Sequence, residues 1–384
     1  MFDFEKEKKI NKERIKRLAS WYRDKKEAPL QIDAELHKRC NLRCIFCARY
    51  DEHEKLNEES KKYEMSVEKW LEIVEEAAEL GTVVFNIEGI NEPPAIPELF
   101  FPVIKKIKEV DLYGIVTTNG TLWKNNQLKD LIEINWDRIH FSLHSSKPEI
   151  HDKLTGMKGS FKKAVRIIQN LNKWKKKLKS ERPMLNINIC VNKLNFRELP
   201  KIVKLAKTLK ADYIFTEPIM AYTEMGEKLK LSKKELEELS TIIKNAEKIA
   251  NEFEIDNNFA TQDKNLEKEI VKKTSNMKGL LVKNAKDLPD GLISAPCFKP
   301  WERIAIRFNG LTGHCGFVEE GENVKEKSLK EIWFGEYFKK ARERMLKKEL
   351  FSHCHKCVPS DFTQGKRFRK ELMEFLGIEH ERDN

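Results

Sequence analysis

The sequence lacks any long apolar run. Hydrophobic residues make up 40% of its 384 residues but lie in short, separate stretches, and none approaches the roughly 20 residues that cross a bilayer. The N-terminus reads MFDFEKEKKINKER and carries charges where a signal peptide would be apolar. No internal repeat or low-complexity tract is present. These absences predict a cytoplasmic globular protein without a membrane span, long enough for one large domain and a smaller one.

Acidic residues are outnumbered by basic ones. The 73 Lys and Arg against 62 Asp and Glu give a formal net charge of +11. Such an excess attracts polyanions when it is concentrated on one face. Here it is interspersed with glutamate, and its local excesses, such as 173–179 and 366–370, are typical of solvated helix faces. We therefore do not expect nucleic acid as a partner.

Eight cysteines in a reducing compartment favour metal or redox chemistry over disulfides. They form an N-terminal group, a C-terminal group and a single residue: Cys40, Cys44 and Cys47; Cys297, Cys315, Cys354 and Cys357; and Cys190. A structural zinc ion needs four ligands, and His37 is the only further donor beside the N-terminal group. Three thiolates instead suit a four-iron cluster that leaves one iron open to a ligand from outside the protein.

Strand-like and helix-like segments alternate along the chain. Six apolar segments predict strands at 31–37, 82–88, 113–119, 138–144, 185–191 and 212–218. Longer segments with helical spacing lie between them, which predicts an α/β fold with a parallel sheet, doubly wound or closed as a barrel. We divide the chain into a basic helix at 1–30, a partial (β/α)6 TIM-type barrel at 31–252, a linker at 253–290 and a small C-terminal domain at 291–384.

Side-chain alternation favours the barrel. Ile139, Phe141 and Leu143 alternate with polar residues on one predicted strand, and the same holds at 185–191. The polar members of the two strands are His140, Ser142 and His144, then Asn188 and Cys190. If the apolar members meet the helices, the polar members line a lumen suited to a polar substrate. The N-terminal cysteine group directly follows the first strand, at the end of the barrel where enzymes of this architecture place their sites.

At this point the sequence resembles the radical S-adenosylmethionine (radical SAM) superfamily, whose signature is CxxxCxφC with φ aromatic, here Phe46. The resemblance implies that S-adenosylmethionine chelates the open iron and is cleaved to a 5′-deoxyadenosyl radical that removes a hydrogen atom from substrate. Gly89-Ile-Asn91-Glu92-Pro93 is similar to the family's GGEP segment, whose backbone and Glu meet the amino group of S-adenosylmethionine, with Asn91 in place of the central glycine. By resemblance, Asn119 and Ser142 lie near the methionine carboxylate and ribose, and His144 and Asn188 belong to the same cofactor site.

The C-terminal cysteines resemble the SPASM and twitch extensions of the same superfamily. Cys297 is followed after twelve residues by Gly310 and after four more by Cys315, and Cys354 and Cys357 come later. Four thiolates ligate one auxiliary [4Fe-4S] cluster completely, which is the twitch arrangement, and the alternative is a structural zinc site. A hairpin is expected around Asn309-Gly310.

The predicted function is radical chemistry on a polar substrate. Peptide-modifying relatives often carry a leader-binding domain before the barrel. Only about thirty residues precede the first strand here, which favours a small metabolite of the sugar or aminocyclitol type. Oxidation would use the auxiliary cluster, and epimerisation would use Cys190 as hydrogen donor. The alternatives are a maturase of a ribosomally made peptide or protein and a non-catalytic iron-sulfur electron carrier. A ferredoxin- or flavodoxin-type electron donor is expected as partner.

Overall fold

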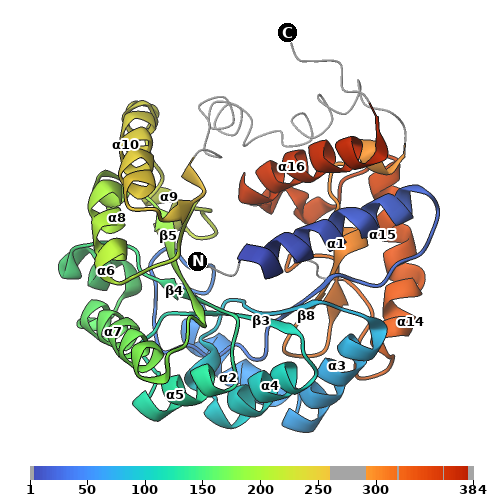
Figure 1. Cartoon of the computed structure of the whole chain (residues 1–384), viewed down its shortest axis with the longest axis horizontal. Helices are drawn as coiled ribbons and strands as arrows, with labels where there is room; N and C mark the ends of the chain where they lie inside the picture. Colours follow the sequence, from blue (N-terminus) through green and yellow to red (C-terminus); the bar gives the residue numbers. More distant parts are fainter. Residues whose placement is uncertain (1–3, 260–290, 318–319, 358, 379–384) are drawn as a thin grey trace.

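The computed structural model describes residues 4–259, 291–317, 320–357 and 359–378. Its centre is one sheet of nine strands in the order β7-β6-β5-β4-β3-β2-β1-β8-β9. The strands are β1 (Gln31–Ala34), β2 (Val84–Ile87), β3 (Tyr113–Thr118), β4 (Arg138–Ser142), β5 (Met184–Val191), β6 (Tyr213–Pro218), β7 (Asp256–Asn257), β8 (Arg303–Ile306) and β9 (Thr312–Gly313). All neighbours pair in parallel except β8 and β9. The sheet curls into an incomplete barrel, which confirms the predicted fold class (Figure 1).

Helices cover the outer face of the sheet (Figure 1). The helices of the described residues are α1 (Phe4–Tyr22), α2 (His53–Tyr63), α3 (Val67–Leu80), α4 (Pro97–Glu109), α5 (Asn125–Glu133), α6 (Pro148–Thr155), α7 (Ser160–Leu178), α8 (Leu199–Thr208), α9 (Glu224–Lys228), α10 (Lys233–Glu252), α13 (Lys299–Glu302), α14 (Leu329–Phe334), α15 (Glu336–Leu346) and α16 (Pro359–Leu376). Helix α3 begins where Ser66 accepts the Lys69 N–H at 3.2 Å and ends at Gly81, which has a φ of 90°. Among the described helices, none has the length and apolarity needed to cross a bilayer.

The predicted alternation of side chains is present on the strands. On β4, Ile139 and Phe141 are fully buried against the helices, whereas Arg138, His140 and Ser142 remain partly exposed although they lie inside the sheet's curve. Strands β3 and β5 alternate in the same way toward their carboxyl ends, and β6 does so from Tyr213 to Glu217. The partly exposed positions include Ile115 and Phe215 as well as polar residues. The inward face of these strands is therefore not completely filled by side chains.

The expected hairpin around Gly310 forms between β8 and β9, but it is not separate from the barrel. Strand β8 pairs in parallel with β1, so that Ile32 lies opposite Ile304 and Ala34 opposite Ile306. This pairing occupies hydrogen-bonding groups on the edge of β1 that six strands alone would leave free. The sheet consequently continues across the boundary expected at residue 291. Of the expected linker 253–290, residues 256–257 form β7, and residues 260–290 lie outside the described part.

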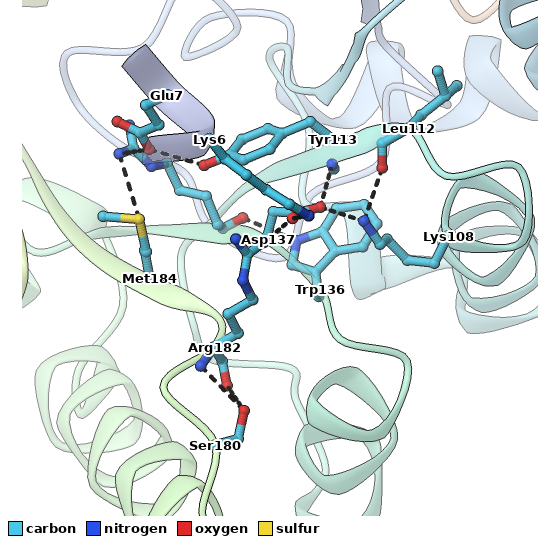
Figure 2. A network of polar contacts seen from close by, with 12 residues as sticks. Lys6, Glu7, Lys108, Leu112, Tyr113, Trp136, Asp137, Ser180, Arg182 and Met184 are labelled. Atoms are coloured by element: carbon cyan, nitrogen blue, oxygen red, sulfur yellow. Dashed lines mark hydrogen bonds and ion pairs between the residues drawn. The ribbon is translucent and has the colours of Figure 1, made fainter. Parts of the chain in front are cut away.

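Helix α1 lies beside α16 and reaches the amino-terminal end of the barrel (Figure 1). Ile15 and Leu18 pack with Trp301 and Leu372, which explains the apolar residues of this otherwise basic helix. At its first turn, Glu7 accepts a hydrogen bond from the Tyr113 hydroxyl at 2.8 Å (Figure 2).

Asp137, at the start of β4, is fully buried in the same polar network (Figure 2). It accepts the Gly114 N–H at 2.9 Å and is paired with Lys108, Arg182 and, at 3.6 Å, Lys6. Such a buried carboxylate is tolerable because several cations and an N–H surround it. The network ties α1 to the strand starts, at the opposite end of the barrel from the N-terminal cysteines.

Candidate active site

The N-terminal cysteines occupy the loop between β1 and α2, at the carboxyl end of the barrel. The Ile45 N–H donates to the Leu154 carbonyl at 3.0 Å, which holds this loop against the end of α6. The Leu42 N–H points at Cys40 Sγ, 3.5 Å away. Burial, and then the nearby Glu92 carboxylate, raises the pKa of Cys40 to about 12. The thiols therefore need a bound cationic centre to become thiolates.

The spacing of the thiols distinguishes a cluster from a single metal ion. Four thiolates around zinc lie about 3.8 Å from one another, given a Zn–S bond of about 2.3 Å. Among the described residues, one set of three donors lies within 4.8 Å of one another, namely His314, Cys315 and His353, and neither cysteine group does so. Neither group therefore has the compact donor arrangement of a mononuclear zinc site.

His37 does not complete a zinc site. Its Nε2 lies 3.1 Å from the Pro93 carbonyl, and its Nδ1 accepts the Arg39 N–H at 3.1 Å. Burial lowers the pKa of His37 to about 4, so the ring is neutral with both nitrogens engaged. His37 therefore adds no donor to the three cysteines of this loop.

Arg49 fixes the cysteine loop and was not predicted from the sequence. Its side chain is 2% exposed, and it donates to the carbonyls of Lys38, Ile90 (2.7 Å) and His53 (3.2 Å) and to Asn57 Oδ1 (2.6 Å). One guanidinium therefore joins the cysteine loop, α2 and the segment after β2. A single arginine near a cysteine motif does not indicate this role, because the local sequence around a buried arginine can be the same as that around an exposed one.

The segment after β2 brings Glu92 beneath the cysteine loop. Glu92 is 1% exposed and accepts hydrogen bonds from the Thr118 hydroxyl and, at 2.7 Å, from the Asn119 N–H. Burial raises the pKa of Glu92 to about 7, and the two hydrogen bonds act against that rise. A carboxylate so placed is ready to pair with an ammonium group. It has no protein cation among the contacts that the structure gives it.

Asn91 and Gly89 have structural explanations. The Asn91 side chain donates to the His37 carbonyl at 2.6 Å, so the residue that replaces the family's glycine ties this segment to the end of β1. Gly89 has a φ of 140°, and a Cβ there would meet the Glu35 side chain at 2.9 Å. The predicted cofactor contacts of Asn91 are therefore limited to its backbone and its Oδ1 atom.

Asn119 links the third strand to the cysteines. Its Nδ2 donates to Asn41 Oδ1 at 3.1 Å and lies 4.0 Å from Cys40 Sγ, while its Oδ1 accepts the Thr121 N–H at 2.8 Å. The side chain is thus adjacent to the N-terminal thiols.

The remaining predicted residues come together on β4 and β5. Ser142 lies opposite Asn188 in the sheet register, and the Phe46 ring meets the His144 ring edge to face with centroids 4.8 Å apart. His144 Nδ1 accepts the Cys190 N–H at 3.2 Å, and burial lowers the pKa of His144 to about 3. His144 is consequently a neutral residue that positions its neighbours.

Asn188 and Cys190 face the lumen near the thiols. Asn188 Oδ1 is buried without a hydrogen-bond partner in the described part of the chain, which leaves an acceptor for a bound molecule. Burial, followed by Glu217 and Cys47, raises the pKa of Cys190 to about 12, so the group stays a thiol. A thiol is the form that can donate a hydrogen atom.

The C-terminal cysteines line one pocket between the barrel edge and α16. Cys297 precedes α13, Cys315 follows β9, and Cys354 and Cys357 lie just before α16. His314 also lines the pocket, but its Nδ1 lies 2.8 Å from the Tyr337 hydroxyl, and burial lowers its pKa to about 3. Four thiols therefore converge although they come from segments up to 60 residues apart in sequence.

Two family models match these same regions. Residues 35–206 match the radical SAM superfamily, and residues 297–358 match SPASM, described as an iron-sulfur cluster-binding domain. The chain therefore contains a radical SAM domain followed by a SPASM iron-sulfur domain. Its cofactors are accordingly S-adenosylmethionine and a [4Fe-4S] cluster in the radical SAM domain, with auxiliary iron-sulfur ligation in the SPASM domain.

Curated relatives are about a quarter identical in sequence to this chain over the aligned residues. A tungsten-containing aldehyde ferredoxin oxidoreductase cofactor-modifying protein from Pyrococcus furiosus is 26% identical over 189 residues, which is 49% of this chain and 51% of the relative. PqqA peptide cyclase from Granulibacter bethesdensis is 27% identical over 188 residues, 48% of this chain and 46% of the cyclase. The chain thus spans about half the length of these relatives.

Solved structures of radical SAM proteins share the fold. Streptococcus suis SuiB bound to S-adenosylmethionine superposes with a TM-score of 0.61 at 16% identity, covering 82% of this chain and 68% of SuiB. The structure named native anSMEcpe with bound AdoMet gives 0.59 at 18% identity, covering 91% and 98%. At these identities the likeness concerns the fold alone.

Proposed function

We propose that this chain is a radical SAM enzyme that modifies a ribosomally made peptide or protein. The bound cluster and S-adenosylmethionine would supply a 5′-deoxyadenosyl radical able to abstract hydrogen from substrate. The observation that carries the proposal is the set of three thiols on one loop, with Glu92 and Asn119 beside Cys40.

Each predicted site residue then has a task. Cys40, Cys44 and Cys47 would hold the cluster. Glu92 would accept the amino group of S-adenosylmethionine, because it is a buried carboxylate without a protein cation among its contacts. The lumen residues Asn119, Ser142 and Asn188 would bind its carboxylate and ribose, and Phe46, held by His144, would close one side.

The relatives favour a peptide substrate over the small metabolite predicted from the sequence. PqqA peptide cyclase acts on a peptide by name, SuiB has been solved with the precursor peptide SuiA, and anSMEcpe with the Cp18Cys peptide. The short segment before the first strand pointed the other way, but it bears on leader binding rather than on the chemistry of the lumen. The unclosed barrel, whose inward face is not completely filled by side chains, is compatible with entry of an extended chain.

A small molecule is the second candidate. It is supported by the relative named as modifying the cofactor of a tungsten enzyme, and by lumen groups such as His140 and Asn188 that would suit a compact polar ligand. A sugar or aminocyclitol substrate has no such support among the relatives reported above.

The test begins with anaerobic reconstitution, iron counting and addition of dithionite and S-adenosylmethionine. We expect 5′-deoxyadenosine by liquid chromatography and mass spectrometry. The protein is then incubated with a randomised peptide library, and products are sequenced by mass spectrometry. Peptides of altered mass support the maturase. Cleavage with no altered peptide favours the small-molecule candidate, and no cleavage by the two-cluster protein supports an electron carrier.

A further inference from the structure

A buried cation stands at the C-terminal cysteine pocket. Lys299, two residues after Cys297, lines this pocket together with all four cysteines. Its Nζ lies 2.5 Å from Asp361 Oδ2, and the same oxygen lies 3.7 Å from Cys357 Sγ. The ion pair with Asp361 holds the Lys299 ammonium beside these thiols.

A second cation, Arg303 at the start of β8, belongs to two sites. It lines the cysteine pocket, and its Nη1 lies 3.0 Å from Oδ2 of Asp33 on β1. The side chains of Arg303 and Asp33 are 14% and 10% exposed. Oδ1 of Asp33 accepts the side-chain amides of Gln31 (2.5 Å) and Asn86 (3.0 Å), so this carboxylate is fixed in the lumen wall. The β1–β8 pairing that extends the sheet creates this shared wall.

Each cation of the pocket wall has a carboxylate partner. Lys299 pairs with Asp361, whose Oδ2 lies 3.7 Å from Cys357 Sγ, and Arg303 pairs with Asp33 on the lumen side. Glu302 also lines the pocket, but it is paired with Arg14 at 2.9 Å. Reduction adds one negative charge to a cluster, and cations in a poorly solvated wall stabilise that charge strongly.

We propose that Lys299 and Arg303 raise the reduction potential of the auxiliary cluster, and that Asp33, a lumen residue that touches none of its thiols, lowers that potential through Arg303. The proposal rests on the proposed function only in requiring a cluster at Cys297, Cys315, Cys354 and Cys357. Lys299 and Arg303 act on the cluster through their positive charge, and neither is proposed to contact substrate.

The test is a redox titration of the full-length, two-cluster protein followed by electron paramagnetic resonance. The auxiliary signal is the one that S-adenosylmethionine leaves unchanged. Lys299→Met is expected to lower the equilibrium constant for reduction at least tenfold, which is about 59 mV for a one-electron couple. Lys299→Arg keeps the charge and is expected to retain the parent potential. Lys340→Met is the matched control, because Lys340 is 68% exposed and paired with Glu336 on α15.

Asp33→Asn is expected to shift the auxiliary reduction potential in the direction opposite to Lys299→Met. Removing the carboxylate leaves Arg303 uncompensated, so the auxiliary potential is expected to rise, whereas Arg303→Met is expected to lower it. If Lys299→Met loses its cluster, Lys299→Arg, Arg303→Met and Asp33→Asn still decide the question. Unchanged potentials in Arg303→Met and Asp33→Asn, or a fall in Asp33→Asn, would overturn the inference. Iron sufficient for one cluster alone in the parent protein would instead overturn the auxiliary site itself.

Discussion

The two cysteine sites differ in how many thiols they offer and in the charges around them. The N-terminal loop supplies three thiols beside one buried cation, Arg49, and one buried carboxylate, Glu92. The C-terminal pocket supplies four thiols against a wall that contains Lys299 and Arg303. An incomplete ligand set leaves room for a cosubstrate, and a complete set does not. The first site is therefore built for binding and reaction, the second for holding charge.

Substitution of the cysteines is expected to give the largest difference between the two sites. Cys44→Ala is expected to abolish 5′-deoxyadenosine formation, because two thiols cannot hold the reactive cluster. Cys357→Ala is expected to retain much of this cleavage while impairing substrate turnover. Both are measured by mass spectrometry with iron counted in each variant. Equal loss of cleavage in the two variants would show that the C-terminal site is needed to fold the protein.

Substitution of Arg49 is expected to destabilise the N-terminal cysteine site and to leave the C-terminal site intact. Arg49→Met removes the four hydrogen bonds of a buried guanidinium, at about 1 kcal/mol each, so we expect the free energy of unfolding to fall by about 4 kcal/mol. The N-terminal cluster should be lost while the auxiliary signal persists. Urea unfolding and electron paramagnetic resonance check the two effects, and Arg43→Met, an exposed neighbour, is the control. Loss of both clusters together would contradict a local role.

Glu92 gives the N-terminal site a pH dependence. Its pKa rises from 4.5 to about 7 on folding because burial favours the protonated form. A raised carboxyl pKa contributes stability below pH 4.5 that is lost as the pH rises through about 7, up to about 3 kcal/mol in the cluster-free protein.

Glu92→Gln should remove that loss, so the difference between urea midpoints at pH 5 and pH 8 shrinks in the variant. The same substitution should weaken S-adenosylmethionine binding by removing its ammonium partner. Parallel pH profiles for the parent and Glu92→Gln would show that Glu92 is already ionised in the folded, cluster-free protein.

Asn91 is expected to give the smallest effect. Asn91→Gly restores the family's glycine and removes the hydrogen bond to the His37 carbonyl, at a cost of about 1 kcal/mol in the free energy of unfolding. We expect the affinity for S-adenosylmethionine, measured by calorimetry on the reconstituted protein, to change less than tenfold. A larger drop would mean that the Asn91 side chain itself contacts the cofactor.

Much of the fold follows from short-range patterns. The six strands from 31 to 218 were predicted from runs of alternating apolar residues, and each appears in the structure, although β1 ends at Ala34. Strands β7, β8 and β9 were harder to predict from the sequence. They have two to four residues each, too few for a periodic pattern, and their pairing depends on partners distant in the sequence.

The candidate site also combines residues that local sequence patterns predict with contacts that only the tertiary structure shows. The cysteine spacings and the GINEP segment are local, so the sequence by itself determined which residues would gather at the carboxyl ends of the strands. Tertiary structure alone decided that Arg49 is buried beneath the cysteine loop, that Asn91 turns toward His37, and that Arg303 joins the auxiliary pocket to Asp33. Ion pairs and hydrogen bonds between strands need a particular register and a particular neighbour, and neither is encoded in the spacing of residues along one segment.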